Sequence, residues 1–270
     1  MANLLPDPER PGAFRVVAGR TSQSYVDPAD PLRLEFEYVQ RIVEGLLATV
    51  LRRPQDERIR VVHVGGGGLT LARYVATIRP HTAQIVFEPD AELTEKVRRI
   101  LPLPRNSGIK VRALDGRAGV ASLPDDYVDA LILDAFAGAS VPAQLGTAEF
   151  FAEVARTLRP GGVLFGNITD RSPFDWARRA LAGVQHQFRH LVVSSEPSTW
   201  KGRRFGNLVL FASSRPLPAK VHERDPGISI FPYRVRFGSD LTRFIGGATP
   251  FTDADAEPSP GPPGGLNWFT

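Results

Sequence analysis

The sequence contains no cysteine, so disulfide bonds, thiolate metal sites and a cysteine nucleophile are all excluded. It also has no apolar run that approaches the ~20 residues needed to span a membrane. Residues 1–12 are polar and rich in proline, without the apolar core of a signal peptide. From these absences we expect a cytoplasmic protein with no membrane partner.

Lysine is scarce, and the formal net charge of +4 comes mainly from arginines scattered among acidic residues. Only Arg203 and Arg204, together with Lys201, form a compact basic patch. A solvated basic face explains this distribution better than a nucleic-acid footprint does. We therefore expect no nucleic-acid partner.

The histidines and serines show neither a metal-site spacing nor a hydrolase pattern. His186 and His190 lack nearby carboxylates at ligand spacing, so no metal is expected. His63 lies within an apolar segment, where a hydrogen-bonded core histidine is the simpler interpretation. No Gly-x-Ser-x-Gly segment occurs, which argues against a hydrolase nucleophile elbow.

What the chain does have is a regular alternation of strand-like and helix-like segments. The segments that favour strands are 59–64, 83–88, 109–113, 128–133, 163–167, 189–195 and 206–212. Helical spacing is predicted between them over 69–78, 90–100, 147–158 and 173–186. This alternation predicts an α/β, Rossmann-like fold with a mostly parallel seven-stranded sheet and helices on both faces.

Three segments are expected along the 270 residues. Residues 1–55 contain a small β-hairpin within 13–27 and a helix with apolar spacing from Leu32 to Leu51. Residues 56–215 form the α/β domain. Residues 216–270 form a C-terminal extension, rich in proline and glycine and flexible or draped from about 252.

The chain is organised around a glycine cluster at residues 65–68. Four residues that favour a strand precede the cluster, and a helical pattern begins directly after it. A strand that ends at glycines before a helix leaves a crevice where a ligand can approach the backbone closely. We expect Gly65, Gly66 and Gly67 to contact a nucleoside there. Glu88 closes the second strand, 21 residues after Gly67, and would accept hydrogen bonds from a ribose.

Polar residues also close the next three predicted strands. Asp115 and Gly116 follow the third strand, Asp134 follows the fourth, and Asn167 ends the fifth. Because ligands bind beyond the carboxyl ends of strands in an open parallel sheet, these side chains are expected in one crevice. Asp115 could accept a hydrogen bond from the amine of an adenine, and Asp134 would project into the same space.

On these segments the chain resembles the spermidine synthase group, the polyamine aminopropyltransferases of the S-adenosylmethionine-dependent methyltransferase superfamily. The resemblance covers roughly residues 20–214. Its nucleoside-binding part rests on Val64–Gly67, Val86–Asp90, Asp115-Gly116, Asp129–Asp134 and Leu158–Gly162. Its narrower part rests on Gln23, Glu37-Tyr38 and the late turn Pro197–Gly202. The resemblance implies a methyltransferase-type fold and a homodimer.

The resemblance also implies roles for single residues. Glu88 would hold the ribose, Asp115 would hold the adenine amine, and Asp134 would accept a proton from the attacking amine. On the acceptor side we expect Gln23, Tyr38, Phe136, Asn167 and Trp200, of which the resemblance places Tyr38 and Trp200 next to the acceptor. Phe136 belongs to the loop 135–146, which would close over the acceptor.

Three positions depart from the family pattern. Gly68 stands where the family has an aspartate that grips the aminopropyl amine, and Ala137 stands where it has an acid that holds the diamine. Trp200 replaces a tyrosine, although its ring face can still attract a cation. Charge-assisted bonds to such amines are worth ~1.5–3 kcal/mol each, so their loss argues against ordinary aminopropylation of putrescine. A glycine at position 68 would also tolerate the carboxylate of intact S-adenosylmethionine, which an aspartate would repel.

We therefore predict an alkyltransferase that moves an aminopropyl or a methyl group to a small-molecule nucleophile, expected to be an amine. The donor would be decarboxylated S-adenosylmethionine or S-adenosylmethionine, and no metal would be needed. A NAD(P)-dependent oxidoreductase is an alternative that shares Gly65, Gly67 and Glu88, although Thr70 replaces the third glycine of that fingerprint. A non-catalytic nucleoside-binding or scaffold protein is a further alternative, suggested by the missing acids.

Overall fold

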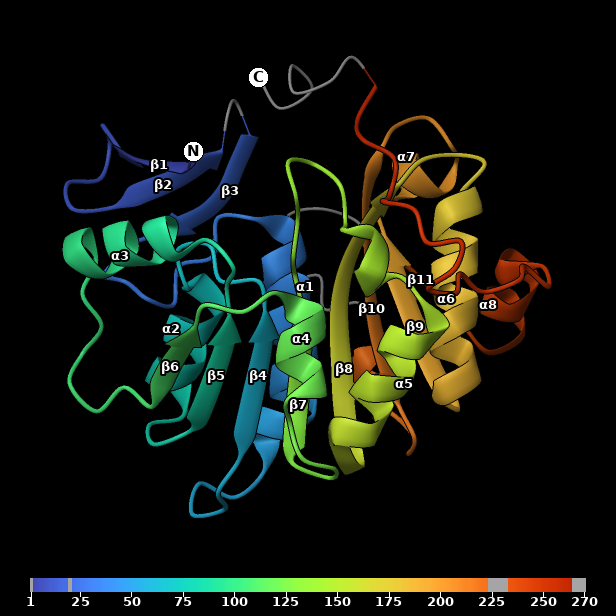
Figure 1. Cartoon of the computed structure of the whole chain (residues 1–270), viewed down its shortest axis with the longest axis horizontal. Helices are drawn as coiled ribbons and strands as arrows, with labels where there is room; N and C mark the ends of the chain where they lie inside the picture. The colour runs from blue at the N-terminus through green and yellow to red at the C-terminus, as the bar shows by residue number, and fades with distance from the viewer. Residues whose placement is uncertain (1, 19–20, 223–232, 264–270) are drawn as a thin grey trace.

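The computed structural model describes residues 2–18, 21–222 and 233–263 of the chain. Within them a large mixed sheet carries helices on both faces, and a small second sheet lies at one side near the N-terminus (Figure 1). The part of the C-terminal tail beyond residue 263 lies outside the described residues.

The large sheet is parallel at its centre and antiparallel at one end. Its parallel strands are β4 (Arg60–Val64), β5 (Ala83–Phe87), β6 (Ile109–Arg112), β7 (Val128–Leu133) and β8 (Leu158–Asp170). Its antiparallel strands are β9 (His190–Ser195), β10 (Gly206–Ser213) and β11 (Arg234–Phe237). The order across the sheet is β11-β9-β10-β8-β7-β4-β5-β6.

The predicted α/β class and mostly parallel sheet are confirmed, but within the described residues the sheet has eight strands and not seven. The additional strand, β11, comes from the C-terminal segment, where Arg234–Phe237 pairs with Val192–Ser195. Its four residues alternate arginine with apolar side chains, and so short a run does not stand out in the sequence as a strand. The C-terminal segment therefore completes the main sheet.

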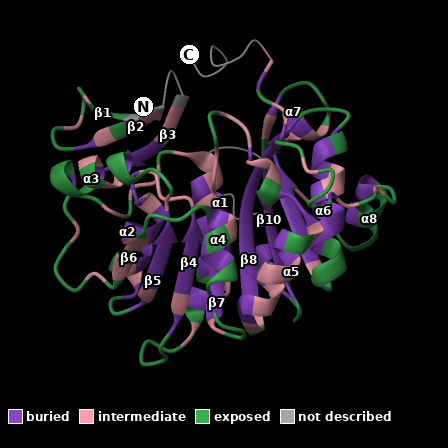
Figure 2. Ribbon diagram, in the orientation of Figure 1, coloured by how far each residue is buried: buried purple, intermediate pink, exposed green. Residues whose placement is uncertain are grey.

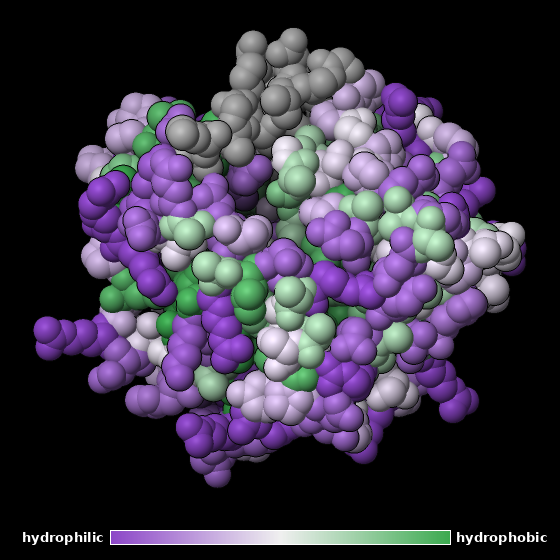
Figure 3. Space-filling model, in the orientation of Figure 1, coloured by the Kyte–Doolittle hydropathy of each residue, from purple (hydrophilic) through white to green (hydrophobic). Residues whose placement is uncertain are grey.

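Helices cover the two faces of the large sheet because its strands are apolar on both sides. One face packs against α4 (Gly116–Ala121), α5 (Ala148–Thr157), α6 (Asp175–Gln187) and α8 (Gly238–Ile245). The other face packs against α1 (Glu37–Ala48), the 3₁₀ turn η1 (Val50–Arg52) and α2 (Thr70–Ile78). The strands are buried and the outer sides of the helices are exposed (Figure 2). On the face drawn in Figure 3, hydrophilic side chains predominate and apolar ones lie between them in small groups.

The N-terminal β element is larger than the expected hairpin. It is a three-stranded antiparallel sheet of β1 (Ala2–Pro6), β2 (Phe14–Ala18) and β3 (Thr21–Val26). Val16 and Val26 pack in one apolar cluster with residues of α2 and of α3 (Ala91–Ile100). The small sheet therefore lies directly over the glycine cluster that precedes α2.

Helix α1 begins at Glu37, five residues later than the apolar spacing from Leu32 predicts. The intervening residues are not helical, and two of them, Glu35 and Phe36, line the site cavity. Short helical turns complete the chain, namely η2 (Ala143–Leu145), α7 (Pro197–Trp200) and η3 (Ala219–Val221).

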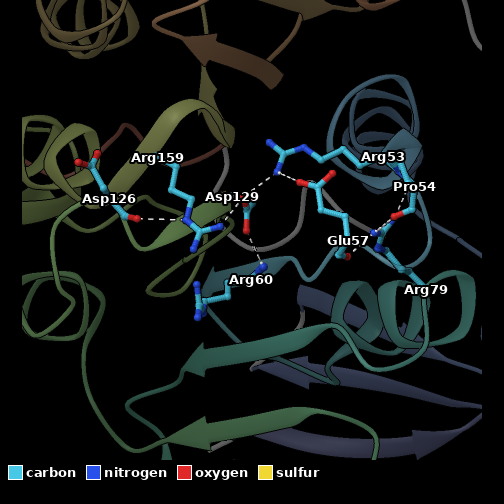
Figure 4. Close-up of polar contacts among 8 residues, drawn as sticks. All are labelled: Arg53, Pro54, Glu57, Arg60, Arg79, Asp126, Asp129 and Arg159. Atoms are coloured by element: carbon cyan, nitrogen blue, oxygen red, sulfur yellow. Dashed lines mark hydrogen bonds and ion pairs between the residues drawn. The ribbon is translucent and has the colours of Figure 1, made fainter.

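Buried Asp129 ties together the end of the sheet that lies away from the glycine cluster (Figure 4). One of its carboxylate oxygens pairs with Arg53 at 2.7 Å and with Arg159 at 3.5 Å, and the other accepts the backbone N–H of Arg60 at 2.8 Å. Arg79 donates to the backbone oxygens of Arg53, Pro54 and Glu57 beside it. A buried charge needs such partners, and here they fix the segment after α1 to β4 and β7.

Candidate active site

The site lies where the strand order reverses, between β4 and β7, with β5 on one side and β8 on the other. Such switch points leave a crevice beyond the carboxyl ends of the strands. Gly65 follows β4 and has a φ of +99°, and a Cβ there would lie 2.2 Å from the backbone oxygen of Asp134. Only glycine allows the two strand ends to approach in this way.

Glu88 lies beside the glycine turn. Its Oε2 accepts the backbone N–H groups of Gly66 at 2.9 Å and Gly67 at 3.2 Å, and its Oε1 accepts the N–H of Asp90 at 3.0 Å. An ionised carboxylate has about four acceptor sites, so about one is left for a ribose hydroxyl. The glycine turn thereby orients the acid that the sequence predicts as the ribose ligand.

Asp115 lies at the N-terminus of α4, where its Oδ1 accepts the N–H of Ala118 at 3.0 Å. This hydrogen bond fixes the side chain at the rim of the crevice, and the carboxylate is exposed there. Gly116 is buried next to it, and a Cβ at that position would come within 2.3 Å of Val64. Both residues line the same cavity as the glycine turn.

Asp134 follows β7 and is held by two side chains from other elements. Asn167 of β8 donates its Nδ2 to Oδ1 of Asp134 at 3.1 Å, and the Tyr38 hydroxyl of α1 is hydrogen-bonded to the same carboxylate. Burial raises the pKa of Asp134 to about 6, against the opposite effect of these two hydrogen bonds. Burial and the neighbouring Asp134 raise the pKa of Tyr38 well above its ordinary value, so the phenol stays a donor.

One cavity of about 680 Å³ contains all these groups. The carboxylates that line it are Glu35, Glu37, Glu88, Asp115, Asp134 and Glu196, and its arginines are Arg15 and Arg204. Arg204 is paired with Glu196 at 3.2 Å. The excess of carboxylates gives the cavity a negative potential, which favours cationic ligands.

The structure brings most of the predicted site residues together in this cavity. Those that line it are Gly65, Gly66, Gly67, Glu88, Asp115, Gly116, Asp134, Gln23, Tyr38, Phe136 and Asn167. Gln23 contacts the loop 135–146 through a 3.4 Å hydrogen bond from its Nε2 to the backbone oxygen of Gly138. Their individual roles toward a ligand stay predictions.

Trp200 is not among the lining residues, contrary to its predicted place beside the acceptor. Its indole N–H donates to the backbone oxygen of Arg234 at 2.9 Å, and its ring packs against Phe174 and Phe244. Arg236 lies over the same ring at 4.5 Å. The tryptophan therefore attaches β11 and α8 to the turn after β9, and its apolar surface is used in packing.

Gly68 does not face the cavity either. A Cβ at this position would lie 2.6 Å from Cγ2 of Val26 and 2.9 Å from Oγ of Ser24, both on β3. The space that an aspartate would need is occupied by the N-terminal sheet. Ala137, the other departure from the family pattern, does line the cavity and is exposed.

Sequence reasoning missed three acids of the cavity, namely Glu35, Glu37 and Glu196. Glu37 is the first residue of α1, and Glu196 directly precedes α7. Acids at these places are ordinary near helix N-termini, so neither one signals a ligand by itself. The sequence could have pointed to these two acids through their neighbours, because Glu37 adjoins Tyr38 and Glu196 adjoins the Pro197–Gly202 turn.

Among the residues described, no cluster of histidine and acidic side chains could hold a metal ion. No helix in the same ranges is both long and apolar enough to cross a bilayer. His63 is buried, and its Nε2 lies 2.9 Å from Oε1 of Gln84. Burial lowers the pKa of His63 to about 4, so the imidazole is neutral at physiological pH.

Comparison with curated proteins finds polyamine aminopropyltransferases. The chain is 28% identical over 197 residues to the enzyme of Vibrio vulnificus, a match that covers 72% of this chain and 61% of that protein. The protein of Chromobacterium violaceum is 25% identical over 152 residues, 56% of either chain. The chain therefore spans less than two thirds of the length of these relatives. A scan against protein-family models finds no match.

Among solved structures, a probable spermidine synthase from Corynebacterium glutamicum matches with a TM-score of 0.86 and 31% identity, covering 93% of this chain and 92% of that one. Human methyltransferase-like protein 13 in complex with SAH matches with a TM-score of 0.56 and 20% identity over 81% of this chain and 96% of that one, which supports the fold alone. The near end-to-end match to the Corynebacterium protein shows that the chain belongs to the spermidine synthase-like (polyamine aminopropyltransferase) group of the S-adenosylmethionine-dependent methyltransferase fold.

Proposed function

We propose that this chain transfers an aminopropyl group from decarboxylated S-adenosylmethionine to an amine of a small polyamine. The observation that carries the proposal is one continuous cavity, which runs from Glu88 and Asp115 past Asp134 to Glu37 and Glu196. The first part suits a sulfonium nucleoside, because Glu88 and Asp115 can accept hydrogen bonds from a ribose and an adenine amine. A cationic amine fits the last part, because that end is lined by acids.

The choice of aminopropyl over methyl transfer rests on the tail of the donor. Intact S-adenosylmethionine carries a carboxylate that needs a cation or free N–H groups. Two N–H groups of the glycine turn are already donated to Glu88, and Gly68 packs against β3 and does not open onto the cavity. The excess of acids in the lining favours the decarboxylated donor, whose tail is purely cationic.

The reaction is an in-line displacement at the carbon next to sulfur. The donor supplies a sulfonium leaving group that departs as a neutral thioether, methylthioadenosine, when it takes the electrons of the C–S bond. Asp134 accepts a proton from the attacking amine as the new C–N bond forms. Tyr38 and Asn167 hold the carboxylate in place by hydrogen bonds. Alignment of the amine with the reacting carbon can supply ~7–11 kcal/mol in ideal cases.

Two measurements test the proposal. Calorimetry should show that decarboxylated S-adenosylmethionine binds at least about tenfold more tightly than S-adenosylmethionine, as expected when one charge-assisted interaction differs. Incubation with putrescine or spermidine should release methylthioadenosine together with an aminopropylated amine. Methyl transfer from S-adenosylmethionine without any aminopropyl transfer would overturn the choice of donor.

A variant and its control separate chemistry from folding. Asp134→Asn should lower turnover by ~10²–10⁴-fold, because the proton acceptor is lost, with little change in the affinity for methylthioadenosine. Asp56→Asn makes the same substitution at an exposed position outside the cavity and should leave turnover unchanged. Full activity of Asp134→Asn would contradict the assigned role.

A further inference from the structure

We propose that Asn167 positions the attacking amine and restricts the reaction to primary amines. Its side-chain oxygen accepts one N–H of the amine while Asp134 accepts the other. This inference rests on the proposed function and names the class of nucleophile that the same site can use. It follows from the direction in which each end of the Asn167 amide points.

Asn167 lies in the middle of the large sheet and is held there by its neighbours. Its strand, β8, lies between β7 and β10, and the residue itself pairs with Val209 of β10. Asn167 is 1% exposed and lines the cavity. A close-packed side chain on a central strand has little freedom to turn, so the direction of the amide group is fixed before a ligand binds.

Asp134 determines which end of the amide faces it. Nδ2 of Asn167 donates to Oδ1 of Asp134 at 3.1 Å. An ionised carboxylate only accepts hydrogen bonds, so the nitrogen of the amide must face it and the oxygen must point elsewhere. That oxygen, Oδ1 of Asn167, is buried and has no hydrogen-bond partner within the described residues. Buried acceptors without a donor are rare in native proteins, so a donor from the ligand is expected here.

The two acceptor oxygens have the spacing that one amine nitrogen requires. The bond lengths of a planar amide place Oδ1 of Asn167 about 4–5 Å from Oδ1 of Asp134 when Nδ2 donates to that carboxylate oxygen. Two acceptors that each bind one N–H of the same tetrahedral nitrogen at ~2.9 Å are about 4.7 Å apart. A single amine nitrogen can therefore donate one N–H to each residue.

A neutral primary amine has two N–H bonds and one lone pair. With one N–H donated to Asp134 and the other to Asn167, the lone pair takes the remaining tetrahedral direction and is free to attack the carbon next to sulfur. The C–N bond forms as the C–S bond breaks, and sulfur keeps the electrons of the broken bond. The proton beside Asp134 passes to its carboxylate. Sulfonium and carboxylate both become neutral, and the product is a neutral secondary amine that keeps its N–H to Asn167.

This arrangement discriminates between classes of amine. A secondary amine has a single N–H, so it must leave either Asp134 or the oxygen of Asn167 without a donor. A site built to accept a hydrogen bond rejects a ligand that cannot supply it. The secondary nitrogen that the reaction creates is therefore not used again, and the products are linear polyamines.

The test compares putrescine with N,N′-dimethylputrescine, in which both nitrogens are secondary. The wild-type protein should prefer putrescine by at least about tenfold in kcat/KM, as expected when one hydrogen bond to a reacting group is lost. Asn167→Leu has a similar volume and no acceptor, so it should lower kcat/KM for putrescine about 10- to 100-fold and reduce the preference about tenfold. Loss of the hydrogen bond to Asp134 affects both acceptors equally and cancels in this ratio.

Asn3→Leu makes the same substitution at an exposed position on β1, outside the cavity, and should change neither value. Thermal unfolding and the affinity for methylthioadenosine establish that each variant is folded. Product analysis with excess donor needs no variant, and the wild-type protein should form no tertiary amine.

Tertiary amines among the wild-type products would overturn the inference, as would an unchanged preference in folded Asn167→Leu. A merely structural role of Asn167 would lower the rates with both acceptors and leave their ratio as it is. If the wild-type protein transferred no group to either amine, the proposed function would be contradicted and the role of Asn167 would fall with it.

Discussion

At the scale of single residues, the surroundings of Asp134 would adjust its carboxylate for the proposed proton transfer. Burial raises its pKa to about 6, and the hydrogen bonds from Asn167 and Tyr38 act against that rise. A base must be ionised to accept a proton, and one with a pKa near the working pH combines a usable charged fraction with useful basicity. Burial together with the hydrogen bonds from Asn167 and Tyr38 would therefore set the pH range in which the proposed base is ionised.

We expect kcat/KM to fall about tenfold per pH unit below a pH of about 6, as Asp134 becomes protonated. Tyr38→Phe removes a hydrogen bond that favours the charged form, so the acid limb should move to higher pH. A pH–rate profile of the wild-type protein and of the variant would measure the shift. Tyr74→Phe, which alters a buried tyrosine outside the cavity, should leave the limb in place.

An acid limb that stays in place in Tyr38→Phe would show that the phenol does not act on Asp134. A limb near the ordinary pKa of an aspartate would show that burial does not raise the pKa of this carboxyl group. The first outcome concerns the hydrogen bond from Tyr38 and the second concerns the burial of Asp134, so the profile tests the two effects separately.

At the scale of elements, the N-terminal sheet packs against α2. This packing limits which side chains fit at the positions of the glycine cluster. We expect Gly68→Asp to lower the free energy of unfolding by ~1–3 kcal/mol, because its Cβ would overlap Val26 and Ser24 of β3. It should not tighten amine binding, although it restores the family residue. Chemical denaturation and calorimetry with the donor would measure the two effects.

Ala137→Asp is the counterpart, because position 137 is exposed and lines the cavity. Its free energy of unfolding should stay within about 0.5 kcal/mol of the wild-type value. Equal stability of the two variants would contradict the packing that we describe around Gly68.

The sequence predicts the parallel part of the sheet and most residues at the strand ends because both depend on local patterns. Glu88 and Asp134 directly follow β5 and β7, Asp115 comes three residues after β6, and Asn167 lies within β8, which continues three residues beyond its predicted end. The carboxyl ends of parallel strands lie at the same edge of a sheet. The surroundings of Gly68 could not be predicted in this way, because they depend on a sheet that packs from more than 40 residues away in the chain. Trp200 was misjudged because β11 and α8 cover it, and both are weak signals in the sequence.

At the scale of the whole molecule, the C-terminal segment ties the cavity loop to the rest of the protein. Residues 234–245 form β11 and α8, and the chain then runs back across α5 and α6. The indole of Trp176 donates to the backbone oxygen of Glu257 at 2.8 Å, and Arg179 pairs with Asp255. The expected division into three segments stays a prediction, as does the homodimer, which light scattering of the purified protein would check.

Ser259 connects this segment to the cavity loop, and its side chain is 2% exposed. Its Oγ accepts the N–H of Val141 at 2.8 Å, and its own N–H donates to the oxygen of Val141 at 3.1 Å. Val141 lies within the loop 135–146, and loop residues before and after Val141 line the cavity. Ser259 therefore holds the loop that would cover the acceptor.

Ser259→Ala should lower the free energy of unfolding by ~1–3 kcal/mol, because it leaves the buried N–H of Val141 without its acceptor. It should speed amide exchange at Val141 and lower kcat several-fold, while the affinity for methylthioadenosine stays unchanged, since the nucleoside residues lie on other loops. Ser214→Ala, at an exposed position, is the control. Unchanged exchange at Val141 would mean that the loop is held by its own packing, and the C-terminal segment would then have no part in closing the site.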